Sequence, residues 1–364
     1  METISFARGI PAPELLPVAE LADCAREAIE RDGATILNYG AAGGYEPLRR
    51  WIGERHSVDP SRVVVTNGSL QGLAFLAKQL VPHGRVLVET PTYDRPLKLL
   101  AEMGADVTGI PLDEEGLDIG ALEGELEAGP AASFLYTIPT FQNPSGRTLS
   151  TERRRRLVEL ARERGLLIVE DDPYGLVRFD GEPPPTLFEL AGGKGVVYGS
   201  SFSKTIAPGA RVGYLVLPDE LAQAVTASAT ATYITPSLIG EAAVYEFLRR
   251  GLLEPNLERV RAELRTRRDA MLSALDAEVG GEGRWTRPEG GYFVWLELGA
   301  GVDGRELLQR AEAAGVTFVP GADFGGPPNS LRLAFSFVDA VAVAEGIARL
   351  ASLVPASASV QLAQ

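Results

Sequence analysis

The sequence predicts an α/β protein in which a mostly parallel sheet covered by helices is followed by a smaller α+β domain. Three observations support this fold class. Short apolar runs alternate with helical patterns through the middle of the chain, and polar residues directly follow several of these runs. After a long Arg-rich helical stretch at 254–275, the pattern changes to strands with helices between them. We therefore expect an N-terminal segment (1–35) that joins the small domain, a large domain (36–265) and a small C-terminal domain (266–364).

The expected strands of the large domain are short and buried. In chain order they lie at 86–89, 133–138, 166–170 and 196–198. Residues 152–164 predict a helix, because Leu157, Leu160 and Ala161 share one of its faces. In the C-terminal part, we expect strands at 292–298 and 330–335 and a frayed tail after Val354.

Composition limits the classes of function. The net charge of −14 argues against nonspecific binding of nucleic acid, for which a basic face is expected. Cys24 is the single cysteine, which excludes an intramolecular disulfide, and it lies in a helical pattern typical of an inert core residue. Two histidines suggest no metal cluster. The start of the chain lacks a secretion signal and 224–240 is rich in Ser and Thr, so we expect a cytoplasmic protein without a membrane partner.

Lys204 lies in the Ser-rich run 199–211 and is the strongest candidate for a catalytic residue. A site that desolvates its amine or places cations beside it would lower its pKa and make it a nucleophile able to form a Schiff base. The hydroxyls of Ser201 and Ser203 and the guanidinium of Arg211 would suit a phosphate ester next to it. On these residues alone, a solvated lysine in a surface loop explains the pattern equally well.

Carboxylates close the predicted strand 166–170, where open α/β sheets bind ligands. Asp171 could pair with the nitrogen of a pyridine ring and keep it protonated, while the Tyr174 hydroxyl donates to the phenolic oxygen of that ring. A solvated acidic turn is the alternative.

Two further turns add candidate ligand contacts. Asn143 offers an amide in a Pro-punctuated turn after 133–138. At 63–72 a strand, a glycine turn and a helical pattern follow one another, so the backbone N–H groups near Gly68 and the Ser69 hydroxyl would face an anion. Many such turns bind nothing.

Taken together, these segments resemble the fold-type-I pyridoxal-phosphate-dependent aminotransferases of class I and II. The resemblance is closest to the subgroup of 2-aminoadipate and kynurenine/aminoadipate aminotransferases and to the aminotransferase-like halves of certain transcription factors. It extends from 4–11 to 331–335, nearly the whole chain.

The resemblance implies a role for each candidate at the cofactor, pyridoxal phosphate. Lys204 is similar to the Schiff-base lysine, Asp171 to the partner of the ring nitrogen, and Tyr174 and Asn143 to the partners of the ring's O3′. Tyr93 is similar to the aromatic residue that stacks on the ring. The residues that resemble the phosphate site are Gly68, Ser69, Leu70 through its backbone, Ser201, Ser203, Arg211, and Tyr39 from the neighbouring subunit of a homodimer.

On the substrate side, Arg332 is similar to the arginine that binds the α-carboxylate, with Asn143 beside it, and Gly9 to a glycine that lines the pocket. Two positions depart from relatives: Leu70 replaces a glutamine near the phosphate, and Arg8 replaces a glycine. We expect Arg8 either to reach the distal carboxylate of an acidic substrate or to face solvent.

The implied activity is a ping-pong transfer of an amino group from an L-amino acid to a 2-oxo acid, with 2-oxoglutarate the expected acceptor. The resemblance leaves open another reaction on the same cofactor: decarboxylation, elimination, cyclisation or oxidation. A nicotinamide-dependent oxidoreductase is a weaker alternative, based on the G-x-G-x-x-G match at 299–304; Asp303 is better explained as a helix N-cap. A non-enzymatic binding module would need a DNA-binding domain before Ile4.

Overall fold

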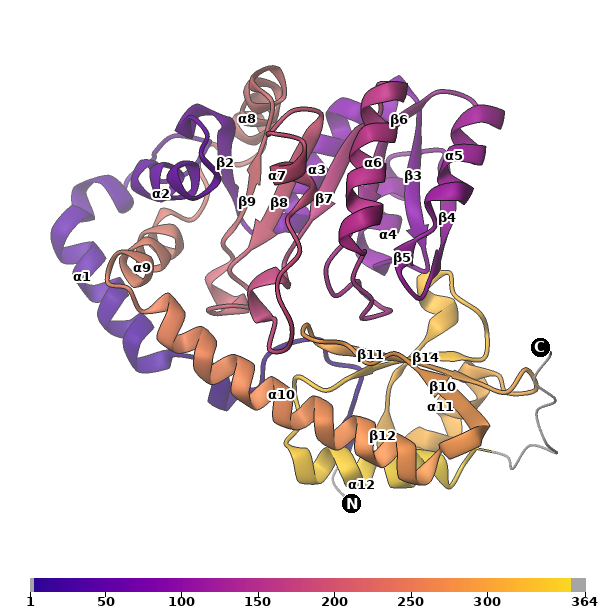
Figure 1. Cartoon of the computed structure of the whole chain (residues 1–364). Coiled ribbons are helices and arrows are strands. Elements are labelled where there is room, and N and C mark those ends of the chain that lie inside the picture. The colour runs from indigo at the N-terminus through magenta and orange to yellow at the C-terminus, as the bar shows by residue number, and fades with distance from the viewer. Residues whose placement is uncertain (1–2, 355–364) are drawn as a thin grey trace.

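An eight-stranded sheet forms the centre of the large domain in the computed structural model, which describes residues 3–354 (Figure 1). Its order is β2-β9-β8-β7-β6-β3-β4-β5. The five strands from β8 to β4 run parallel, whereas β9 is antiparallel to both neighbours and β5 to β4, which confirms a mostly parallel sheet. The strands are β2 (Val63–Thr66), β3 (Arg85–Thr90), β4 (Val107–Asp113), β5 (Gly116–Leu117), β6 (Ala132–Thr137), β7 (Leu167–Asp171), β8 (Val196–Ser201) and β9 (Gly213–Val216).

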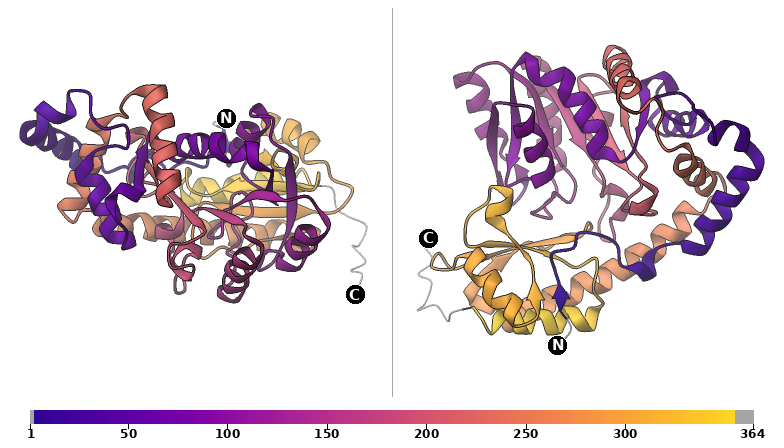
Figure 2. Two further views of the ribbon diagram at one scale, coloured as in Figure 1. Left: turned by 90° about the horizontal axis from the view of Figure 1, so that it is seen from above. Right: turned by 180° about the vertical axis from the view of Figure 1, so that it is seen from behind.

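Helices cover both faces of this sheet, as the view from above shows (Figure 2). The helices form one layer on each face. Val86 and Val88 of β3 pack against the first of these layers, and Leu87, between them, packs against the second, because successive strand side chains point to opposite faces. The first layer holds α3 (Ser69–Leu80), α4 (Asp94–Glu102) and α8 (Asp219–Tyr233). The second holds α2 (Glu46–His56), α5 (Ile119–Ala128), α6 (Thr151–Arg164), α7 (Leu187–Leu190) and α9 (Leu238–Arg249), with α1 (Val18–Ile36) packed along α9.

The small domain is an antiparallel sheet in the order β10-β11-β14-β13. The N-terminal segment joins it, because β1 pairs in parallel with β12 before the chain enters α1 (Figure 2). Its strands are β1 (Ile4–Ser5), β10 (Gly283–Trp285), β11 (Phe293–Leu298), β12 (Val316–Thr317), β13 (Val319–Pro320) and β14 (Ser330–Ala334), and its helices are α11 (Gly304–Ala313) and α12 (Ala340–Ala351).

A long helix, α10 (Leu253–Glu278), runs from the large domain along the small one (Figure 1). Near its start the Asn256 amide donates to the carbonyl oxygen of Thr205, beside Lys204, at 2.7 Å. Further along, Arg267 donates to the carbonyl oxygen of Ser336 at 3.0 Å, just after β14. The domain boundary expected at 265 therefore falls inside one continuous helix.

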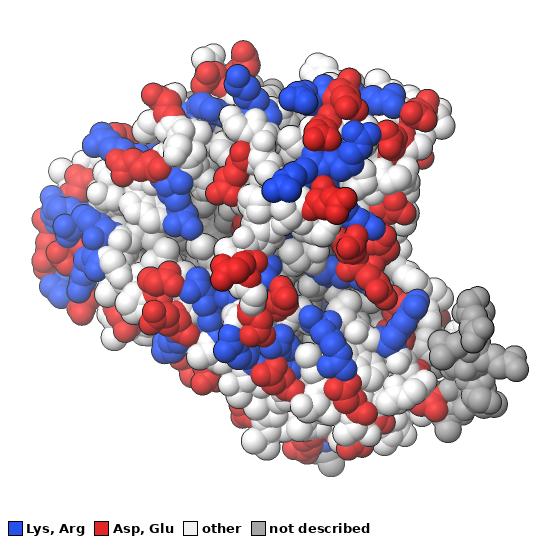
Figure 3. Space-filling model, viewed as in Figure 1, with Lys and Arg blue, Asp and Glu red and all other residues white. Residues whose placement is uncertain are grey.

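The expected strands and helices differ from the observed ones by at most three residues at either end. Cys24 is buried in α1, as expected. Between residues 3 and 354, no helix combines the length and apolar character needed to cross a bilayer. Acidic and basic side chains are interspersed on the face drawn in Figure 3. The tail after Val354 lies outside the described residues.

Candidate active site

Lys204 follows β8, and its amine lies between the two domains. Nζ donates to the carbonyl oxygen of Gly9 at 2.7 Å and lies 5.3 Å from the ring centre of Tyr292 and 5.9 Å from that of Tyr174. Burial, with Arg332 and Arg211 nearby, lowers the pKa of Lys204 to about 8. The lower pKa increases the fraction of unprotonated amine near neutral pH, and the unprotonated amine is the form that acts as a nucleophile.

Asp171 is the last residue of β7 and has one carboxylate oxygen without a partner. Oδ2 accepts a hydrogen bond from the Tyr136 hydroxyl at 2.7 Å, whereas Oδ1 is buried and has no hydrogen-bond partner among the described residues. Burial raises the pKa of Asp171 to about 6, although the hydrogen bond from Tyr136 opposes this shift. A buried, unpaired acceptor is costly, which indicates a ligand donor at this position.

A small hollow, of about 20 Å³, lies beside Asp171. Ser69 and Leu70 line it from the start of α3, and Tyr93 lines it from the start of α4. Tyr93 is partly buried, and burial raises its pKa. The hollow thus brings together an aromatic ring, a helix N-terminus and the free Asp171 oxygen.

The phosphate-site candidates gather where α3 begins. Gly68 is its N-cap with φ of +92°, and a Cβ at this position would lie 2.2 Å from Nη2 of Arg211, so only glycine fits. Arg211 Nη2 donates to the carbonyl oxygen of Asn67 at 3.1 Å. The Ser201 hydroxyl donates to that of Ser203 at 2.8 Å. Helix N–H groups, hydroxyls and a guanidinium are the donors that suit a phosphate.

Arg332 projects from β14 between two phenyl rings. Its guanidinium carbon lies 4.4 Å from the ring centre of Phe293 and 4.8 Å from that of Phe324. Nη1 donates to Asn143 Oδ1 at 3.0 Å and Nη2 to the carbonyl oxygen of Ala7 at 2.9 Å, while Nε has no partner among the described residues. Burial lowers the pKa of Arg332 to about 10, so it remains a cation at neutral pH, able to bind a carboxylate.

Gly9 and Tyr174 complete the interior of the site. A Cβ at Gly9 would lie 2.6 Å from the Phe293 ring, so a side chain there would displace that ring. Tyr174 is buried against Tyr292 and Phe293, with ring centres 5.6 and 5.9 Å away. Burial raises the pKa of Tyr174 well above its ordinary value, so its hydroxyl stays a neutral donor.

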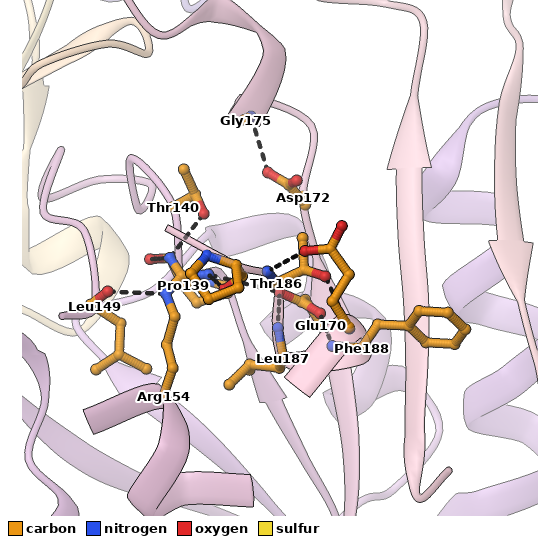
Figure 4. A network of polar contacts seen from close by, with 12 residues as sticks. Pro139, Thr140, Leu149, Arg154, Glu170, Asp172, Gly175, Thr186, Leu187 and Phe188 are labelled. Atoms are coloured by element: carbon orange, nitrogen blue, oxygen red, sulfur yellow. Dashed lines mark hydrogen bonds and ion pairs between the residues drawn. The ribbon is translucent and has the colours of Figure 1, made fainter. Parts of the chain in front are cut away.

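The carboxylates next to Asp171 point to the opposite face of the sheet, where they belong to a polar network (Figure 4). Glu170 accepts from the backbone N–H groups of Leu187 and Phe188, and burial raises its pKa to about 7. Asp172 accepts from the Tyr198 hydroxyl at 2.9 Å and from a backbone N–H. Of the three consecutive acids, Glu170 and Asp171 both line the hollow, but only Asp171 has a buried carboxylate oxygen without a partner among the described residues.

Tyr39 and Arg8 lie at the surface of the chain. Tyr39 is 77% exposed and lines a hollow that Ser237 also lines. The Ser237 N–H donates to Oδ1 of Asn67, the neighbour of Gly68. Arg8 is exposed, with its guanidinium carbon 4.9 Å from the ring centre of Phe337.

Asp303 is the N-cap of α11, as expected, and accepts from the backbone N–H groups of Arg305 and Glu306. The G-x-G-x-x-G match at 299–304 is therefore a strand-to-helix turn of the small domain that ends in a helix N-cap. This structural role explains the glycines without dinucleotide binding.

Comparison with known proteins supports the resemblance. The family model "Aminotransferase class I and II" matches residues 12–350. A 2-aminoadipate transaminase of Thermus thermophilus is 42% identical over 95% of this chain and 89% of its own length, and aromatic-amino-acid aminotransferase 1 of Thermococcus litoralis is 35% identical over 97% and 88%. The crystal structure of the α-aminoadipate aminotransferase LysN of Thermus thermophilus, complexed with N-(5'-phosphopyridoxyl)-L-leucine, superposes with a TM-score of 0.92 at 40% identity and covers 97% of this chain and 92% of that chain.

Proposed function

Because the chain belongs to the aminotransferase class I and II family, we propose that Lys204, Asp171 and Arg332 form the site at which it transfers amino groups. The protein is a pyridoxal-phosphate-dependent aminotransferase of fold type I, as its family and its relatives show. It moves an amino group from an amino acid to a 2-oxo acid. The observation that carries the assignment of the site is the buried Asp171 Oδ1, which needs a donor from a ligand.

The residues present fit the cofactor. Asp171 Oδ1 would accept from the ring nitrogen, Tyr93 would pack on the ring, and Tyr174 and Asn143 would donate to its phenolic oxygen. When bound, pyridoxal phosphate supplies an aldehyde that takes up the amino group and a ring that withdraws electrons. The residues that would hold its phosphate are Gly68, Ser69, Leu70 through its backbone, Ser201, Ser203 and Arg211.

The substrate is held and deprotonated by two side chains. Arg332 binds the α-carboxylate, fixed between Phe293 and Phe324 so that its orientation is set before the substrate arrives. Lys204 would hold the cofactor through its amine. With the substrate in place, the free amine of Lys204 would take the proton from the substrate's Cα.

A half-reaction screen tests this function. Each amino acid is added alone to the holoenzyme, and both the visible spectrum of the cofactor and the released product are followed. Transamination converts the cofactor to its amine form and releases a 2-oxo acid, and 2-oxoglutarate then restores the starting spectrum. Release of carbon dioxide, an elimination product or a cyclic product, with the spectrum returning unaided, would assign the alternative chemistry on the same cofactor.

Arg8 is proposed to select acidic substrates, although in the structure its guanidinium lies over Phe337. If it turns to the distal carboxylate of glutamate, 2-aminoadipate or 2-oxoglutarate, Arg8→Gln should raise KM for acidic donors about ten- to a hundredfold, the value of a charged hydrogen bond at ~1.5–3 kcal/mol. KM for leucine should stay nearly unchanged. Steady-state kinetics with both kinds of donor checks this, and equal losses, or none, would show that selectivity lies elsewhere.

We also propose that the active unit is a homodimer with shared sites, supported by the exposed Tyr39. Three further apolar side chains are exposed close to it in sequence or on the facing segment: Leu37, Ile234 and Ile239. Tyr39 would reach the phosphate held in the neighbouring subunit. The cytoplasmic location stays a prediction.

Hybrid dimers test the shared site. Lys204→Ala and Tyr39→Ala homodimers should each be nearly inactive, the second because the phosphate loses a contact. Subunits exchanged between them should recover part of the activity, because one site of each hybrid then has both residues. Activity is measured before and after mixing, and sedimentation gives the oligomeric state. A fully active monomer at assay concentration would contradict the proposal.

A further inference from the structure

Tyr136 hydrogen bonds to Asp171 from the neighbouring strand. Its side chain is 1% exposed, and its hydroxyl donates to Oδ2 at 2.7 Å. The register of the sheet explains this contact: Tyr136 is paired with Val169, and Asp171 lies two residues further along β7 on the same face. A long side chain reaches such a diagonal neighbour. The contact is therefore set by two central strands rather than by a loop.

This hydrogen bond gives the two carboxylate oxygens different surroundings. Oδ2 is held by Tyr136, which leaves the buried Oδ1 beside the hollow. Burial and the nearby Asp171 raise the pKa of the Tyr136 phenol well above its ordinary value, so it stays a neutral donor at working pH. It can only donate to the carboxylate.

The hydrogen bond also favours the ionised form of Asp171. Burial and the neighbouring Asp172 raise the pKa of Asp171, and the hydrogen bond from Tyr136 lowers it. Among residues 3–354, the other titratable groups that interact with the carboxyl are Glu89 on β3, Tyr93 before α4, and Asp172 and Tyr174 after β7. These groups are acids or phenols, so none of them supplies a positive charge that would stabilise the carboxylate.

We propose that Tyr136 is a positioning residue of the reaction, which turns Asp171 Oδ1 toward the ring nitrogen of pyridoxal phosphate and keeps the carboxylate ionised. The inference rests on the proposed role of Asp171. One proton is shared between the carboxyl and the ring nitrogen, and the hydrogen bond to Oδ2 favours its residence on nitrogen. A protonated ring withdraws electrons more strongly, so Tyr136 acts on the rate through Asp171.

The opposite face of the sheet offers a matched control. Tyr198 donates to Asp172 Oδ2 at 2.9 Å, which is the same kind of bond between a buried tyrosine and the next carboxylate along the chain. Asp172 takes part in the network of Figure 4 and lies outside the lining of the hollow. Tyr136→Phe and Tyr198→Phe each delete one hydroxyl and leave one buried carboxylate oxygen without that donor.

The test uses holoenzyme loaded with pyridoxal phosphate carrying ¹⁵N in the ring. Asp171→Asn should move the ¹⁵N resonance to the position of an unprotonated ring. Tyr136→Phe should move it toward that position, with the ratio of protonated to unprotonated nitrogen about ten- to a hundredfold lower, the range expected for a charged hydrogen bond. Tyr198→Phe should keep the wild-type resonance. The kcat of Tyr136→Phe should fall while KM for the amino acid stays constant, because Arg332 is untouched.

The possible outcomes separate the two claims. A wild-type resonance in Tyr136→Phe, with a displaced one in Asp171→Asn, would overturn the role of Tyr136 alone. A wild-type resonance in Asp171→Asn would overturn the proposed role of Asp171 itself. Equal displacements in Tyr136→Phe and Tyr198→Phe would assign the effect to general loosening of the sheet. If Tyr136→Phe holds too little cofactor for the spectrum, its cofactor affinity is measured with and without Asp171→Asn. If the effects of the two substitutions on cofactor affinity simply add, the proposed coupling between Tyr136 and Asp171 is also refuted.

Discussion

Lys204→Ala should abolish the covalent link to pyridoxal phosphate and lower turnover by at least about 10²- to 10⁴-fold, the contribution of a positioned general base. The fold should persist, because an apolar residue replaces a desolvated amine. Borohydride reduction of the wild type, followed by peptide mapping, should place the label on Lys204. Label on Lys78, Lys98 or Lys194 instead would contradict the assignment, as would turnover that survives the substitution.

The same variant carries a pH signature in the cofactor-free protein. Burial lowers the pKa of Lys204 from its ordinary value of 10.5 to about 8, so the unfolded chain binds this proton more tightly than the folded one. Below pH 8 the protonated lysine lowers the free energy of unfolding by its full amount, and this loss becomes smaller between about pH 8 and 10.5. As the pH rises across that range, the free energy of unfolding of the wild type should therefore increase relative to that of Lys204→Ala. Urea denaturation at several pH values measures it.

Asp171→Asn should lower kcat by orders of magnitude, each tenfold step corresponding to about 1.4 kcal/mol of barrier, because an amide cannot keep the ring nitrogen charged. Removing one partner of a buried ion pair also typically costs ~3–5 kcal/mol, so the affinity for the cofactor should fall as well. Single-turnover kinetics with a saturating amino acid separates the two effects.

Asp172→Asn is the control for this prediction. Asp172 points to the other face of the sheet, so its loss should weaken the fold while leaving kcat nearly intact. A crippled Asp172→Asn enzyme beside a mild Asp171→Asn would show that the two acids had been assigned to the wrong faces.

The alternation of strands and helices was sufficient to predict the sheet, because apolar runs such as 133–138 are buried on both faces. Antiparallel β9 and strand β4, which lies next to the short edge strand β5, escaped prediction. The first has four residues, and the second contains Gly109 and Pro111, which weaken the strand signal. β8 continues through Ser200 and Ser201 because both pair with β9, a tertiary effect invisible in local sequence.

For the site, the chain itself supplied the loop lysine and the acids at a strand end, and the family resemblance supplied their roles. The contact of Tyr136 with Asp171 depends on the register of two strands 35 residues apart in the chain, and no local pattern encodes that register. The packing of Arg332 between Phe293 and Phe324 likewise depends on tertiary structure, since Phe324 comes from a short turn at Gly321–Phe324. Knowledge of which strands are neighbours would have revealed the contact between Tyr136 and Asp171.

The helix α10 sets the distance between the two halves of the site. Asn256 fixes the backbone beside Lys204, and Arg267, eleven positions later, fixes the backbone just after the strand that carries Arg332. At a rise of 1.5 Å per residue, roughly 16 Å of helix separates these two anchors. Inserting a single residue between them would turn one anchor by about 100° relative to the other. During evolution or engineering, this span of helix can therefore change its residues but not their number.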